Sequence, residues 1–288
     1  MFPYILFLIL FSAEPAAGGY ALAAPSSSGY WAMTWGFGEL HHVDRDGNAT
    51  VIDFPSPGWT SVSALAVSGD TAALRVSRSA YDMVLVITGD SITEEYGPYS
   101  RAGAPVFSRS RDLWFTADGT LHRNGISTGT ALDAYTIAVD GNGSRVAFCD
   151  EADRLLMLNI NSGDTRILAE HRRFYSPMFI SFGAEQYLIS PSLDGEILLL
   201  DPESGARRVL AEGTHPCWME EEGLLLYSVT EDDGHMITSG EIWAADLKGN
   251  RRRLTFTPEV HEILPFCSGG VIEALNAETG AVVQVEGP

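Results

Sequence analysis

A short turn containing a glycine recurs along the chain at nearly equal intervals, each time between two apolar runs. Successive turn glycines are separated by 42, 36, 38, 42, 44 and 31 residues. A period near 40 residues is typical of repeat architectures, in which each unit packs against the next. The spacing therefore restricts the chain to a small set of repeat folds. The turn glycines are Gly47, Gly89, Gly125, Gly163, Gly205, Gly249 and Gly280.

The rest of each unit also consists of short strands. Residues 30–44 align without gaps with 187–201, and residues 197–212 with 272–287. Runs such as 145–149 are rich in β-branched and aromatic residues, and no segment shows a sustained helical period. Because proline can begin a strand but not sit within its ladder, we expect a first strand to start at each of several prolines. The expected first strands start near Ser63, Pro105, Thr136, Pro177, Pro216 and Pro265.

Four short strands per unit of about 40 residues indicate a β-propeller blade. We predict an all-β protein with seven blades of four-stranded antiparallel sheets, and six blades are the alternative because only six first strands can be found. The first unit, 30–54, lacks its innermost strand, and the last, 263–286, is short by about one strand. We therefore expect one propeller domain, 30–288, closed by the N- and C-terminal strands.

Three segments resemble the repeats of TolB-like propellers, whose blades read P-x-W-S-P-D-G, then an I-A-F strand, I-Y-x-x-D and D-G-x-x-x-x-L-T. They are Pro216–Trp218, Val139–Phe148 and Glu241–Thr255. The resemblance covers about residues 30–288 and implies a propeller that works through protein–protein contacts at a cell envelope. The S-P-D-G turn is eroded here, and the domain that precedes the propeller in TolB has no counterpart. Similar propellers also precede the hydrolase domain of prolyl-oligopeptidase-like peptidases, and that domain is absent too.

The first residues have the pattern of an export signal. An apolar run, 4–11, is followed by Ala21-Leu22-Ala23, an A-x-A site. We expect a signal peptide over 1–23, a short linker over 24–29 and a mature protein in the periplasm or outside the cell. No later stretch approaches 18 apolar residues, so an integral membrane protein is not expected after removal of the signal.

The net charge of the chain limits the classes of partner that it can bind. The chain has 38 acidic and 18 basic residues, a formal net charge of −20. Nucleic-acid binding is excluded as the main role, because it requires clusters of Lys and Arg against phosphates. We expect a monomer, and the resemblance to TolB-like propellers implies a protein partner.

Several motifs have a chemical and a structural interpretation. Residues 125–129 match G-x-S-x-G, but the glycine occupies a hairpin turn, so we interpret the segment as a turn. Residues 44–48 and 140–144 resemble the start of a calcium loop without its distal Glu, and turn chemistry explains them. His41 and His42 should point to opposite faces of a strand. The cysteines show no metal-binding spacing and are expected in the core; they are Cys149, Cys217 and Cys267.

The most unusual segment is 230–240, an acidic insertion between two strands of the sixth unit. Long loops on a rigid scaffold often carry binding residues. Asp232, Asp233 and His235 are therefore the candidate metal ligands, with calcium as the candidate ion, although no cofactor is required by the sequence.

We predict a non-catalytic protein-interaction or ligand-binding module. One alternative is a propeller-type hydrolase, lactonase-like and metal-assisted, with carboxylates and histidines converging at the channel mouth. A second is a glycan-binding propeller that uses exposed aromatic rings, although core packing explains these tryptophans as well. The aromatic candidates are Trp31, Trp35, Trp59 and Trp114.

Overall fold

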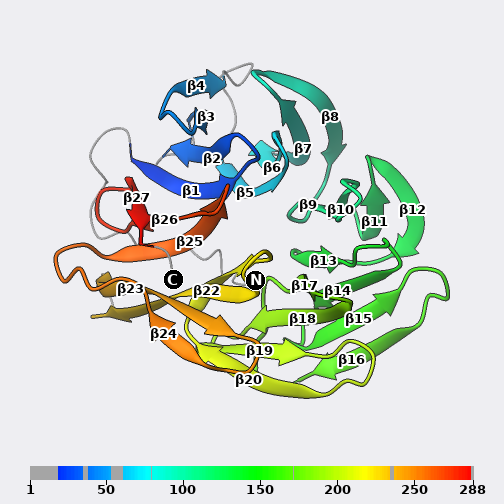
Figure 1. Ribbon diagram of the computed structural model, residues 1–288. Helices are drawn as coiled ribbons and strands as arrows, with labels where there is room; N and C mark the ends of the chain where they lie inside the picture. The colour runs from blue at the N-terminus through cyan, green and yellow to red at the C-terminus, as the bar shows by residue number, and fades with distance from the viewer. Residues whose placement is uncertain are drawn as a thin grey trace.

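Seven antiparallel sheets form a ring around a central axis in the computed structural model (Figure 1). The structure describes residues 19–34, 38–52, 61–78, 80–170, 172–233 and 237–286. Six sheets have four strands and the last has three, and no described residue is helical. The predicted all-β propeller of seven blades is confirmed, and the alternative of six blades is wrong. We number the blades 1 to 7 in chain order.

Each blade is made of strands that follow one another in the sequence, from the ring axis outward. Blades 1 to 3 comprise β1 (Tyr20–Pro25), β2 (Gly29–Thr34), β3 (Leu40–Asp44), β4 (Ala49–Ile52); β5 (Ser61–Ser68), β6 (Thr71–Arg78), β7 (Tyr81–Thr88), β8 (Ser91–Tyr99); and β9 (Val106–Phe107), β10 (Leu113–Ala117), β11 (Thr120–Arg123), β12 (Ile126–Ala131). Blades 4 to 7 comprise β13 (Ile137–Val139), β14 (Arg145–Cys149), β15 (Leu155–Asn159), β16 (Thr165–Ala169); β17 (Met178–Phe182), β18 (Glu185–Pro191), β19 (Glu196–Leu200), β20 (Arg207–Glu212); β21 (Thr214–Met219), β22 (Leu224–Asp232), β23 (Ile237–Asp246), β24 (Arg251–Arg253); and β25 (Glu262–Ser268), β26 (Val271–Asn276), β27 (Val282–Val285).

The turn glycines explain the regular spacing. All seven have a positive φ, between 65° and 93°, a conformation that residues with a side chain rarely adopt. Six of them connect the third and fourth strands of a blade. Gly280 is the exception, because it connects β26 and β27, the second and third strands of blade 7. The sequence alignment matched Gly280 with Gly205 and therefore placed it one strand too late in its blade.

Two prolines lie inside a strand instead of at its start. Pro105 and Pro177 directly precede β9 and β17, as expected. Pro216 and Pro265 lie within β21 and β25, each at a break in the pairing register. At such a bulge one residue leaves the hydrogen-bonding ladder, so the missing N–H of proline costs nothing there.

The first blade is complete. β1 pairs along β2, with Ala23 opposite Ala32, and supplies the innermost strand that the sequence analysis did not find. This strand occupies residues that were attributed to the signal peptide and the linker. Cleavage after Ala23 stays a prediction, and in the structure that bond lies in the middle of β1.

Neighbouring blades pack face to face through apolar side chains. Between blades 4 and 5, for example, Leu168, Leu188 and Leu198 belong to one buried cluster. Arginines on the outer strands add contacts between blades. Arg207 donates to the Leu168 carbonyl at 2.8 Å, and Arg251 donates to the Leu210 carbonyl at 3.0 Å.

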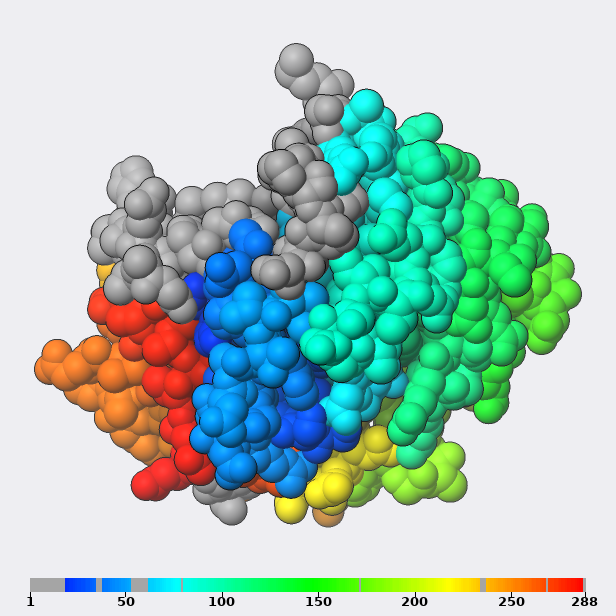
Figure 2. Space-filling model, turned by 90° about the horizontal axis from the view of Figure 1, so that it is seen from above, coloured from blue at the N-terminus to red at the C-terminus, as the bar shows by residue number. Residues whose placement is uncertain are grey.

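The ring closes where blade 7 meets blade 1. Figure 2 shows blade 1 between blades 7 and 2. The backbone N–H of Tyr20 donates to the Gly280 carbonyl at 2.8 Å, and the rings of Tyr30 and Phe266 lie 5.7 Å apart. Within the described ranges no sheet combines strands from both ends of the chain, so side-chain packing and isolated hydrogen bonds hold this seam.

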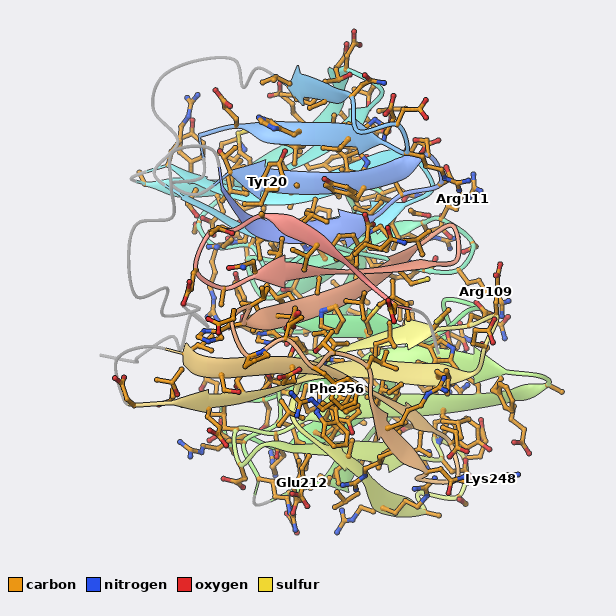
Figure 3. The ribbon with its side chains drawn as sticks, turned by 60° about the vertical axis from the view of Figure 1, so that its left-hand side comes forward. Tyr20, Arg109, Arg111, Glu212, Lys248 and Phe256 are labelled. Atoms are coloured by element: carbon orange, nitrogen blue, oxygen red, sulfur yellow. The ribbon has the colours of Figure 1, made fainter. Side chains whose placement is uncertain are left out.

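The ring has two distinct ends. Turns between first and second strands, and between third and fourth strands, lie at one end, which we call the turn face. Arg109, Arg111 and Lys248 come from such turns and project from the same side in Figure 3. The remaining turns and the connections between blades form the opposite end, the connector face.

Candidate binding groove on the turn face

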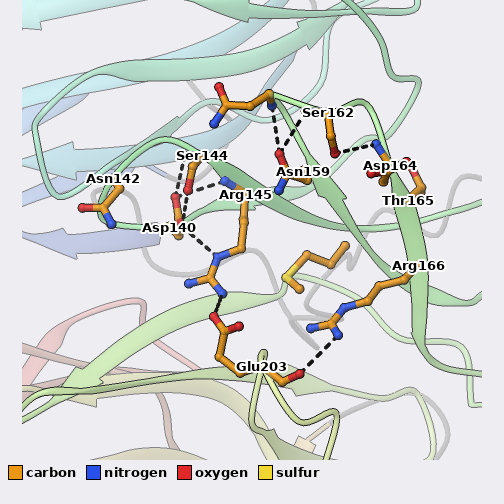
Figure 4. A pocket seen from close by; sticks show the side chains of 12 residues that line it. Asp140, Asn142, Ser144, Arg145, Asn159, Ser162, Asp164, Thr165, Arg166 and Glu203 are labelled. Carbon is orange, nitrogen blue, oxygen red and sulfur yellow. Dashed lines mark hydrogen bonds and ion pairs between the residues drawn. The ribbon is translucent and has the colours of Figure 1, made fainter.

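Two adjoining hollows lie on the turn face over blades 3 to 5. The larger, about 580 Å³, opens between blades 4 and 5 (Figure 4). The smaller, about 260 Å³, lies among the first turns of blades 3, 4 and 5. Asn142 lines both, so we treat them as one feature, the turn-face groove. Its lining residues are Arg109, Asp140–Asn142, Ser144, Arg145, Met157, Asn159, Asn161, Ser162, Asp164–Arg166, Ser181, Gly183–Gln186 and Glu203.

Asp140 anchors the floor of the groove. Its side chain is almost fully buried, and its carboxylate accepts hydrogen bonds from Ser144 N at 2.8 Å, Ser144 Oγ at 3.0 Å, Arg145 N at 3.1 Å and Arg145 Nε at 2.9 Å. Burial alone would raise the pKa of Asp140, but the hydrogen bonds from Arg145 and Ser144 outweigh it and lower the pKa. The carboxylate therefore stabilises the turn that contains it, as the turn interpretation of 140–144 predicts.

Arg145 connects Asp140 to two residues of the neighbouring blade 5. Its guanidinium forms an ion pair with Glu203 of blade 5 and donates to Gln186 Oε1 at 2.5 Å. It also lies 5.9 Å from the ring centre of Phe179. Because one guanidinium holds partners on both blades, the wall of the groove is fixed in position.

Several polar side chains at the rim of the groove have donors or acceptors that form no hydrogen bond within the described residues. Arg166 uses one N–H, to the Glu203 carbonyl at 3.3 Å. Within the part of the chain that the structure describes, no hydrogen bond is formed by the side-chain amides of Asn142 and Asn161. A carboxamide offers both donors and an acceptor. These groups are available to a ligand in the groove.

Arg109 lines the inner end of the groove, toward the ring axis. Arg109 Nη2 lies 2.7 Å from Glu220 Oε1, although the two residues belong to blades 3 and 6. Blades 3 and 6 are not neighbours, so this ion pair links two separate parts of the ring across its axis. The charged bridge thereby limits the groove on the side of the ring axis.

A second cluster of carboxylates lies between blades 6 and 7. Glu241 forms an ion pair with Arg253 and accepts from Thr255 Oγ1 at 2.6 Å, while Glu262 accepts from Thr257. Both glutamates are more than 90% buried. Burial raises the pKa of Glu262, and the nearby Glu241 carboxylate acts in the same direction. The cluster is closed to solvent and lies apart from the groove.

The acidic segment predicted as a metal site is a hairpin. β22 and β23 extend into it, with Thr230 opposite Gly240 and Asp232 opposite Ile237. His235 lies outside the described residues, so the site formed by Asp232, Asp233 and His235 stays a prediction. Elsewhere, the described ranges contain no group of three His, Cys, Asp or Glu residues arranged to hold a metal.

Other sequence interpretations are settled by position. Ser127 of G-x-S-x-G lies on the outer strand β12, so its segment lacks the strand-to-helix turn of a nucleophile elbow. Trp31 and Trp114 are buried in the core, whereas Trp35 and Trp59 lie outside the described residues. His41 bonds to Tyr20 and Glu39, while His42 bonds to Ser26 and Ser28; the two rings point to different partners, as predicted.

The groove itself was missed by the sequence analysis. Its lining comes from turns of three blades, and the contacts join residues about 40 or more positions apart, such as Arg145 and Gln186. The turn at 140–144 drew attention only because it resembles the start of a calcium loop. The one usable signal was the pair of polar turns at 140–144 and 159–164 in the same blade.

Solved structures with this fold have varied activities. The chain resembles virginiamycin B lyase from Staphylococcus aureus with a TM-score of 0.66, at 17% identity over 93% of this chain and 94% of that one. Hydrazine synthase of Kuenenia stuttgartiensis gives 0.65 at 11% identity over 95% and 97% of the two chains. A prolyl endopeptidase gives 0.60 at 14% identity. This chain is covered completely in that match and spans 53% of the endopeptidase.

At these identities the likeness establishes a seven-bladed propeller and nothing finer. No known family and no curated protein matches the sequence. Membership of the TolB-like family therefore stays a prediction. No helix in the described residues is long and apolar enough to cross a membrane.

Proposed function

We propose that this protein is an extracytoplasmic, TolB-like interaction module whose turn-face groove holds an extended polypeptide segment of a partner protein. The observation that carries the proposal is the rim of the groove, where Asn142 and Asn161 present unused carboxamides beside the exposed guanidinium of Arg166. A carboxamide pairs well with a peptide group, because each offers a donor and an acceptor in one plane.

The rigidity of the groove supports the same role. Arg145 and Asp140 lock the two blades through charge-assisted hydrogen bonds, so the groove is preformed and a ligand need not order it. The lining is almost entirely polar, with Met157 as its one large apolar member. A polar extended segment fits such a surface better than an apolar helix does.

The two alternatives receive less support. A glycan site needs exposed aromatic rings, and neither Trp31 nor Trp114 is exposed. The fold is shared with a lyase and an endopeptidase, but the identities of 17% and 14% carry no activity over. For a propeller-type hydrolase, no observation in the described residues favours a reacting centre.

The test is selection from a displayed library of random peptides on the purified protein. We expect to select peptides that bind the wild-type chain. These peptides should bind the Asn142→Ala/Asn161→Ala variant about thirtyfold more weakly, since two hydrogen bonds of about 1 kcal/mol each are lost. The matched control is Thr50→Ala, an exposed position on β4 of blade 1, far from the groove. Equal affinity for both variants, or no enriched peptide, would overturn the proposal.

A further inference from the structure

Two of the three cysteines occupy corresponding places on neighbouring blades. Cys217 lies on β21 and Cys267 on β25, which are the innermost strands of blades 6 and 7. Each thiol packs against the same buried apolar cluster between these two blades. Cys149 lies on β14 of blade 4 and belongs to a different cluster. The cluster shared by the pair comprises Met219, Leu226, Ile242, Ala244, Ile272, Ala274 and Val285.

Side-chain alternation along each strand shows that the two thiols face one another. Trp218 points toward blade 5, where its indole N–H donates to the Ser181 carbonyl at 3.2 Å. Its neighbour Cys217 must then point toward blade 7. Phe266 points toward blade 1, against Tyr30, so Cys267 points back toward blade 6.

The electrostatic surroundings agree with this geometry. Burial raises the pKa of the Cys217 thiol to about 12, and the other groups that act on it are the Cys267 thiol and the Cys267 backbone N–H. The side chain and the main chain of Cys267 are therefore both close enough to Cys217 to act on its pKa.

We propose that Cys217 and Cys267 form a disulfide bond that joins the innermost strands of blades 6 and 7 when the chain folds in an oxidising compartment. The two S–H bonds break and one S–S bond forms. The thiols lose two protons and two electrons, and a disulfide oxidant, such as oxidised glutathione or a thiol–disulfide oxidoreductase, is reduced to two thiols. All three cysteines are free thiols in the structure. In the oxidised protein Cys149 remains a thiol, which accounts for the odd number of cysteines.

Burial decides when the bond forms. The thiolate is the reactive species, and a thiol with a pKa of about 12 is almost entirely protonated at neutral pH. The reduced folded protein should therefore resist oxidation, whereas a chain that folds in the presence of the oxidant forms the bond before the interface between the blades closes.

The test uses the full chain, refolded from denaturant with reduced and oxidised glutathione, then unfolded and treated with an alkylating agent. We expect one alkylated cysteine, Cys149, and a disulfide-linked peptide pair containing Cys217 and Cys267 in the mass spectrum. The bond encloses 49 residues, and its reduction should lower the melting temperature by on the order of 5–10 °C.

Matched variants separate this bond from other pairings. Cys149→Ser should keep the linked peptides and leave no alkylated cysteine, while Cys217→Ser should leave two. Three alkylated cysteines in the oxidised wild-type chain, or a bond that includes Cys149, would overturn the proposal. The readout on the wild-type chain does not depend on the folding of any variant, nor on whether the turn-face groove binds peptides.

Discussion

Arg109 and Glu220 are 111 residues apart in the chain, yet their side chains meet at 2.7 Å across the ring. They belong to blades that have no shared interface, so the pair is a direct link across the ring. Both side chains are more than half exposed to solvent. Exposure limits the strength of such an ion pair, because water screens the charges.

The contribution of this pair to stability should accordingly be small. In a double-mutant cycle with Arg109→Ala and Glu220→Ala, we expect a coupling free energy below about 1 kcal/mol, which decreases further in high salt. Urea unfolding of the four proteins measures it. A coupling of several kcal/mol would show that the pair holds the ring together.

Asp140 should matter far more. The Asp140→Ala substitution removes a buried carboxylate with four hydrogen bonds and leaves Arg145 without its anchor, so we expect a loss of about 3 kcal/mol in the free energy of unfolding. The matched control is Asp44→Ala, which removes the same kind of turn carboxylate from a less buried position in blade 1 and should cost less. Equal losses would contradict the importance of burial.

The pH dependence of stability should reflect Glu262. Its folded-state pKa is raised above 4.5, so the folded protein holds a proton that the unfolded chain releases, and this contribution to stability falls as the pH rises above 4.5. Glu262→Gln removes that dependence. The variant should therefore gain stability relative to the wild type as the pH increases toward neutrality, as measured by urea unfolding along the pH series. A constant difference would contradict the raised pKa.

The role of β1 can be tested with two chains, one starting at Gly19 and one at Ala24, the expected cleavage point. The shorter chain loses most of β1, including the Tyr20 N–H that bonds to Gly280, and opens the seam with blade 7. We expect a lower melting temperature for it. Identical melting curves would mean that β1 is dispensable and that processing after Ala23 is compatible with the fold.

The fold could be predicted because it depends on local signals that repeat. A third-to-fourth-strand turn such as that at Gly205 needs a positive φ, which only glycine adopts readily, and so the sequence records each turn. Strand alternation likewise predicted that His41 and His42 would diverge. One local signal was misleading, because Pro265 resembles a strand start but lies within β25.

The groove could not be predicted because no single segment of the sequence contains a signal for it. Asn142, Gln186 and Glu203 come from two blades and meet only when these blades pack at a defined angle. A polar turn residue that lines a groove has the same sequence neighbours as one that faces open solvent. Its role is set by the adjacent blade.

The seam between blades 1 and 7 implies that the order of the blades is independent of where the polypeptide starts. Every sheet is completed before the chain moves on to the next, so the connections between blades act as tethers and form no part of any hydrogen-bonded ladder. A circularly permuted chain that begins at blade 3 would rebuild the same seven sheets. Complementary surfaces determine which blades pack against each other, such as the surface that Trp218 presents to blade 5.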